Sequence, residues 1–176
     1  MPRLTTTSMV VAAVSLLGCA GGGPPDGGAP DAGGLDAGLP LRGALRLDAI
    51  RGLGGFELPC AADGGQVFRS TFQVPLDGGR AHFEVCRQGG QGMLVGDRVP
   101  SGAQLAALRA AVEGLERSSW TGCGADKATL WLDVTTPAQV FLLADSFYAC
   151  MAGTTGRVPV DHLDAVFQQL DLLAQP

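Results

Sequence analysis

The sequence predicts an α+β fold with two layers, an antiparallel sheet of four or five strands and two helices packed on one face of it. Three observations lead to this class. Segments typical of strands come in pairs joined by turn residues, two segments carry apolar residues at helical spacing, and the order strand–strand–helix occurs twice. Each helical segment has a single apolar stripe, so we expect both helices to cover the same face of the sheet.

The first half of the folded part begins with a predicted strand over residues 44–51, where apolar and polar side chains alternate in part. A hairpin follows, with strands over 66–74 and 80–86 joined by the turn sequence Leu-Asp-Gly-Gly at 76–79. The glycine-rich stretch 88–96 is interpreted as a loop that leads to the first helix.

The first helix is predicted to begin after Ser101 and to run to about Arg117. Ser101 and Gln104 form a capping-box pattern directly after Pro100, which marks a helix start. The apolar residues of this segment recur at intervals of three and four and form one stripe: Leu105, Leu108, Val112 and Leu115.

The second half repeats this order. Strands are predicted over 128–135 and 139–148, and the last helix over 160–173. Its apolar residues step in the same intervals as those of the first helix: Leu163, Val166, Leu170 and Leu173. The pattern predicts an internal duplication of a ββα unit. The alternative is chance similarity between two halves that are both rich in Ala and Gly.

The N-terminus is typical of a secretory signal peptide. One cation, Arg3, precedes an apolar run over 9–17, and this run is shorter than the roughly 20 residues that a membrane-spanning helix needs. The segment Leu16-Leu17-Gly18-Cys19 resembles the bacterial lipobox, which implies removal of residues 1–18 and attachment of lipid, palmitate included, to Cys19. The alternative is a plain signal peptide followed by an incidental cysteine. Ala20, by resemblance to Gram-negative sorting signals, points to the outer membrane.

Residues 19–41 hold the lipid-bearing cysteine and a linker made almost entirely of Gly, Ala, Pro and Asp. This composition offers nothing to bury, so we expect a flexible tether of the cell envelope rather than a folded segment. One globular domain is then predicted over 42–176, a length that supports a single core.

The charge of the chain argues against a nucleic-acid partner. Removal of Arg3 leaves 11 Lys and Arg against 17 Asp and Glu, a net charge of about −6, and the arginines are scattered singly along the chain. Binding to nucleic acid needs clustered cations that neutralise phosphates. The expected partners are a membrane, through the lipid anchor, and another envelope or extracellular protein.

Four cysteines remain beyond Cys19, an even number that predicts disulfide bonds in an oxidising compartment. Four cysteines allow three pairings. The sequence Cys-Ala-Ala-Asp at Cys60 recurs as Cys-Gly-Ala-Asp at Cys123, and a second cysteine follows at a similar distance in each half. The repeat therefore favours Cys60 with Cys86 and Cys123 with Cys150.

No catalytic, cofactor-binding or metal-binding motif is present in the sequence, and we expect no cofactor. His82 and Glu84 lie two residues apart on one strand, which favours a solvated strand face over an acid–base pair. Asp161 and His162 open the last helix, where acids are also favoured by the helix dipole. These four residues are the candidates for an alternative function, an envelope hydrolase or metal-dependent enzyme whose site forms only in the folded chain.

The stretch Leu47-Asp-Ala-Ile-Arg-Gly-Leu-Gly-Gly-Phe56, the order of the elements and Asp126 near the second strand pair resemble emfourin-like proteins. These are small bacterial inhibitors of thermolysin-like metalloproteases. The resemblance rests on Gly54-Gly55-Phe56 and on element order, and it implies the fold and an inhibitory role. The chain departs from the family in its cysteines, its lipid anchor and its longer first hairpin, and no inhibitory residue is assigned.

The function expected from the sequence is that of an envelope-anchored lipoprotein. Its small domain is expected to be non-catalytic and to bind another protein, as a protease-inhibitor-like module would.

Overall fold

The computed structural model describes residues 39–52, 59–62, 65–87, 91–124, 127–150 and 155–175. The predicted signal peptide, Cys19 and all but the last three residues of the linker lie outside these ranges, as do Gly54-Gly55-Phe56 and Asp126. Neither α-helix in the described part is long and apolar enough to cross a membrane.

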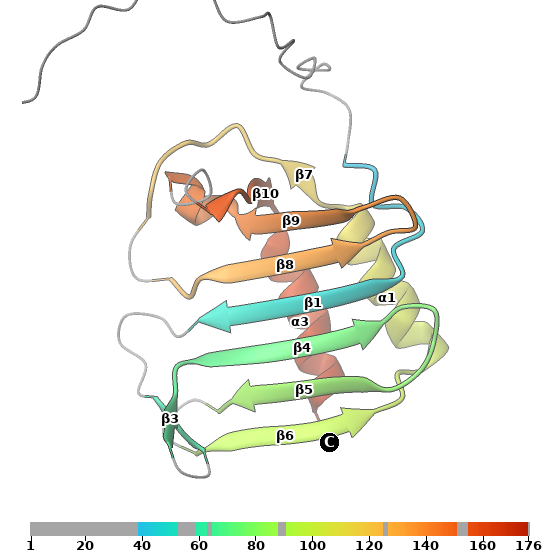
Figure 1. Ribbon diagram of the computed structural model, residues 1–176, viewed down its shortest axis with the longest axis vertical. Helices are drawn as coiled ribbons and strands as arrows, with labels where there is room; N and C mark the ends of the chain where they lie inside the picture. Colours follow the sequence, from blue (N-terminus) through green and yellow to red (C-terminus); the bar gives the residue numbers. More distant parts are fainter. Residues whose placement is uncertain are drawn as a thin grey trace, which may run out of the picture. The chain divides into compact units, whose positions relative to one another are not determined.

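The fold is α+β, built on one eight-stranded sheet whose order is β6-β5-β4-β1-β8-β9-β10-β7 (Figure 1). The strands are β1 (Arg46–Gly52), β4 (Arg69–Pro75), β5 (Ala81–Cys86), β6 (Met93–Arg98), β7 (Glu116–Arg117), β8 (Leu130–Thr135), β9 (Val140–Asp145) and β10 (Val158–Asp161). A separate hairpin pairs β2 (Cys60–Ala62) with β3 (Gly65–Val67). The helices are α1 (Gly102–Glu113) and α3 (Leu163–Ala174), and a short 3-10 helix, η2, covers Ser146–Tyr148.

The expectation of four or five strands was too low, and the sheet is mixed rather than purely antiparallel. β10 pairs with β9 in parallel, whereas every other neighbouring pair in the sheet is antiparallel. β6 falls mostly in the stretch that its glycines led us to interpret as a loop. β10 falls where the last helix was expected to begin, because its four residues are too few to show a strand period.

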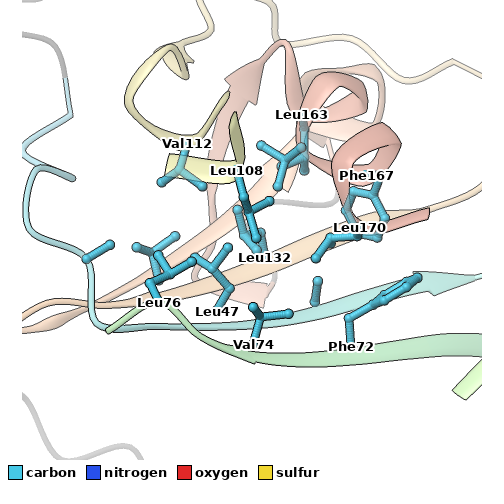
Figure 2. Packing of buried hydrophobic residues seen from close by; sticks show 14 of the residues in the cluster. Leu47, Phe72, Val74, Leu76, Leu108, Val112, Leu132, Leu163, Phe167 and Leu170 are labelled. Atoms are coloured by element: carbon cyan, nitrogen blue, oxygen red, sulfur yellow. The ribbon is translucent and has the colours of Figure 1, made fainter. Parts of the chain in front are cut away.

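Both helices pack on the same face of the sheet, as predicted. They lie behind it in Figure 1, and Figure 2 shows Leu108 and Leu170 pointing toward Leu47 and Leu132 of the strands. All eight residues of the two predicted stripes are buried. The core therefore lies between the sheet and the helix pair, and the alternation along each strand leaves the other set of side chains on the opposite face.

β1 is the centre of the sheet and joins the two halves of the domain. Leu47 lies opposite Val74 of β4 on one side and opposite Val134 of β8 on the other. Each half thus supplies one hairpin, β4–β5 or β8–β9, that extends the sheet outward from β1.

The first helix starts as predicted and ends earlier. Ser101 Oγ accepts a hydrogen bond from Gln104 N at 3.2 Å, and Gln104 Oε1 accepts one from Ser101 N at 2.9 Å. Gly114 caps the helix, and Arg117 belongs to β7, which pairs with β10. After Gly114 the chain leaves the helical path. Leu115 is buried in the core, and Glu116 and Arg117 pair with β10 at the edge of the sheet.

The cysteines pair within each half, in the combination that the sequence favoured. Cys60 is bonded to Cys86 and Cys123 to Cys150, with Cα–Cα distances of 5.5 and 5.3 Å. The β2–β3 hairpin carries Cys60 back to the end of β5, which a single extended strand over 66–74 could not do.

Candidate functional site

The face of the sheet opposite the two α-helices is called the helix-free face. Cross-strand registers place its side chains in two rows. The first row holds Asp97, His82, Gln73, Asp48, Asp133 and Leu142, and the second holds Val95, Glu84, Thr71, Ile50 and Trp131. Both rows run across the strands from β6 to β8 or β9, and neither α-helix covers them (Figure 1).

The ion pair between Arg157 and Asp133 on this face lies next to the Trp131 ring. Arg157 Nη1 lies 2.6 Å from Asp133 Oδ1 and donates to the carbonyl of Leu143 at 3.0 Å. The guanidinium also lies over the Trp131 ring, 5.0 Å from its centroid. Asp133 and the carbonyl of Leu143 thus fix the orientation of the Arg157 guanidinium, which makes a cation–π contact with Trp131.

A second ion pair stands on β1 itself. Arg46 donates to both oxygens of Asp48, at 2.8 and 2.7 Å. The hydrogen bond to Asp48, with its charge, raises the pKa of Arg46. Both side chains are well exposed, so this pair contributes little to stability and leaves charged atoms available at the surface.

The sequence placed His82 and Glu84 on one strand face, and the structure adds a third residue to them. His82 Nδ1 lies 3.0 Å from Asp97 Oδ1, and Nε2 lies 3.7 Å from Glu84 Oε1. Sequence reasoning missed Asp97, because its contact with His82 depends on the register of β5 with β6, which no local pattern reveals. All three side chains are at least one third exposed.

The structure does not bring His82 and Glu84 together with Asp161 and His162. β5 and β10 are five strand spacings apart in the sheet, about 24 Å at about 4.8 Å per spacing. His162 follows β10 directly, in the left-handed conformation with φ of 66°, where the chain turns into α3. Within the described ranges, no three His, Cys, Asp or Glu side chains are grouped so that they could hold a metal ion.

A cavity of about 360 Å³, lined by both charged and apolar side chains, lies on the other side of the sheet, where β1 ends, β8 begins and α3 passes over them. Arg51 donates to both oxygens of Asp171 at 2.8 Å. Its guanidinium lies over the rings of Phe72 and Phe167, at 6.0 and 5.9 Å from their centroids. Arg51 therefore ties the end of β1 to α3.

Lys127, the single lysine of the chain, forms the second charged contact of this cavity. Its Nζ donates to buried Asp145 at 2.6 Å and to Asp164 at 2.8 Å. Burial opposes the charge of the ammonium group, but the hydrogen bonds to the two carboxylates outweigh it and raise the pKa of Lys127. Arg51 and Lys127, the two cations of the cavity, are thus both paired with carboxylates of this chain. These pairs connect the sheet to α3.

Comparison of the chain with protein-family models, with curated proteins and with solved structures finds no match.

Proposed function

We propose that the chain is an envelope-anchored lipoprotein, and that its domain is a non-catalytic module that binds another protein of the envelope or the extracellular space. The observation that supports binding is the helix-free face. Its two rows span six and five strands, and it carries apolar side chains among charged groups that are already paired with one another.

The chemistry of this face suits a protein partner. Protein interfaces mix apolar and polar area, and Trp and Arg are enriched among the residues that dominate their affinity. Trp131 with Arg157 supplies such a centre, and Ile50 lies next to Trp131 across β1 and β8. The paired charges around them lose less on desolvation than isolated charges would.

Site-specific photo-crosslinking in the native membrane tests whether this face binds a protein. A photoreactive amino acid replaces Leu142 on the helix-free face or Ala107 on the exposed side of α1, and the cross-linked species are identified by mass spectrometry. We expect a discrete protein adduct from position 142 that is absent from position 107. Identical adducts at both positions, or none at either, would contradict binding through this face.

The class of partner is taken from the sequence resemblance alone. If the emfourin-like likeness extends to function, the partner is a thermolysin-like metalloprotease. The full chain in detergent is then expected to slow peptide hydrolysis by thermolysin in a dose-dependent manner, and Trp131→Ala is expected to weaken that effect. Unchanged hydrolysis at a large molar excess of the chain would contradict the inhibitory role. Binding itself is tested separately by the crosslinking experiment.

The anchor rests on the lipobox-like segment and is tested at Cys19. Cys19→Ser is expected to move the chain from the membrane to the soluble fraction, since a chain without acyl groups loses its apolar attachment. Metabolic labelling with palmitate is expected to mark the wild type only. Retention of Cys19→Ser in the membrane would contradict the anchor, and separation of the two membranes decides the proposed outer-membrane location.

The internal duplication of a ββα unit is also proposed. It is supported by β4 and β8, which oppose the same residues of β1, and by the two apolar stripes, which cover one face of the sheet. The third strands differ, because β6 runs antiparallel to β5 whereas β10 runs parallel to β9. A duplicated unit would therefore have diverged most in the strand that precedes each helix.

A further inference from the structure

The two edges of the eight-stranded sheet are built differently. At one edge β7 has only two residues, and its neighbour β10 contains Pro159. Short strands and proline are features that prevent an edge from pairing with another chain. The other edge, β6, has six residues, contains no proline or lysine, and carries no charge over its first four residues. No described strand pairs with its outer side.

The register of β6 shows which of its backbone groups face outward. Arg87 N donates to the carbonyl of Gly92 at 3.0 Å, so the hydrogen-bonded pairs of β5 and β6 continue at Leu94 and Gly96. Cys86 N, one residue before Arg87, points the other way and bonds to Ser70 of β4 at 2.9 Å. The N–H and C=O groups that point away from the sheet therefore belong to Met93, Val95 and Asp97.

We propose that β6 pairs with β6 of a second copy of this chain, antiparallel and centred on Val95, to join two sheets into one. In this two-fold register Val95 faces Val95 of the partner subunit, and Met93 faces Asp97 of the partner subunit. All three outward residues then exchange backbone hydrogen bonds, about six in total. If the pairing is instead centred on Leu94 or Gly96, only two of the three outward residues of each β6 face outward residues of the other.

The side chains of β6 fit this register. Val95 is 58% exposed, and on the helix-free face it would meet its own copy, a β-branched pair of the kind that stabilises neighbouring strands. On the helix side Leu94 faces Gly96 of the partner subunit, so no side chain stands directly opposite Leu94. Asp97 does not face its own copy, so no like charges stand directly opposite each other.

A second copy fits this edge better than the chain's own N-terminal segment does. Residues 20–38 consist of Gly, Ala, Pro and Asp with one leucine, and such a sequence has little tendency to form a strand. Edge pairing over five residues is a small interface, so we expect a weak dimer that depends on protein concentration.

Sedimentation equilibrium of the full chain in a density-matched detergent tests the dimer. We expect the mass to rise to that of a dimer as the concentration approaches about 100 µM, a range that populates weak complexes. The mass of a single chain at every concentration overturns the proposal.

The backbone geometry provides a matched pair of variants for the same measurement. Val95→Pro removes an N–H that points away from β5, so the ladder inside the domain keeps its bonds while the outer ladder loses its centre. Val95→Thr keeps the N–H and a β-branched side chain. Monomeric Val95→Pro with dimeric Val95→Thr and similar thermal melting supports the pairing. A dimer of unchanged strength in Val95→Pro overturns it.

Cysteine crosslinking in the membrane decides the question if Val95→Pro does not fold. Facing residues in a hydrogen-bonded antiparallel pair have Cα atoms about 5.5 Å apart, within disulfide range. Val95→Cys is expected to give a disulfide-linked dimer on mild oxidation, and Val140→Cys, 54% exposed on β9, is expected to give none. Equal dimer from both variants means random collision, and a mixed disulfide of Val95→Cys with a different protein assigns the edge to that protein; either result overturns the proposal.

Discussion

Arg51 shows how one residue can join a strand to a helix through three kinds of contact. Its guanidinium forms a bidentate ion pair with Asp171 and lies over Phe72 and Phe167, two rings that meet edge to face at 6.2 Å. No sequence pattern indicated these contacts, because Arg51 and Asp171 are 120 residues apart. The partly buried setting makes this pair stronger than one at the surface.

Replacing Arg51 by Met keeps much of the apolar stem and removes the charge. We expect a loss of about 1–2 kcal/mol in the free energy of unfolding, because Asp171 and both rings lose their partner. The matched control is Arg46→Met, whose pair with Asp48 is exposed and is expected to cost less than about 0.5 kcal/mol. Urea denaturation measures both, and equal losses would show that the cavity contact is no stronger than the surface pair.

Lys127 makes stability depend on alkaline pH. Its pKa is raised from 10.5 in the folded chain, so its stabilising contribution is complete below the unfolded-state value and is lost as the pH rises through the folded-state value. Lys127→Arg keeps the charge at every accessible pH. Above about pH 10.5 the melting temperature of the wild type is expected to fall more steeply than that of Lys127→Arg. Parallel curves would contradict this role.

At the scale of elements, each disulfide closes the loops beside one hairpin. Cys123–Cys150 is accompanied by hydrogen bonds from Gly124 N to the carbonyl of Phe147, at 2.7 Å, and from Cys150 N to the carbonyl of Gly122, at 3.1 Å. These contacts hold the chain after β7 against η2. The Cys123–Cys150 disulfide therefore stabilises the segments around residues 122–124 and 146–150, which contain little regular secondary structure.

The pairing is checked by non-reducing peptide mapping, which is expected to return two bridged fragments, one from each half. Cross-half bridges would contradict it. Cys123→Ala with Cys150→Ala is expected to lower the free energy of unfolding by about 3–4 kcal/mol, a model-dependent value for a loop of this length. Amide protection is expected to fall over 118–124 and 146–150 first, while β1 and β4 keep theirs.

At the scale of the whole molecule, the two halves share one core rather than two. β1 pairs with strands of both halves, and Phe72 from the first half packs against Phe167 from the second. The close-up in Figure 2 shows residues of both helices meeting strand residues of both halves in one layer. The two halves of the chain therefore form a single structural unit.

This shared core predicts cooperative unfolding. The change in far-ultraviolet circular dichroism and the change in tryptophan fluorescence are expected to coincide during thermal melting, because neither half can keep its hydrophobic contacts without the other. Calorimetric and van't Hoff enthalpies are expected to agree. Two separate transitions would show that the two halves unfold independently, which would contradict a shared core.

The sequence by itself determined the α+β class, both helical stripes, the capping box at Ser101 and the choice among cysteine pairings. Each of these depends on short-range periodicity or on spacing within one half of the chain, which a linear pattern records. Only the tertiary structure decided the number of strands, the parallel pairing of β10, the place of Asp97 beside His82, and the free edge at β6. These depend on cross-strand register, which is set by packing of the whole core, and a two-residue strand such as β7 has no period of its own to read.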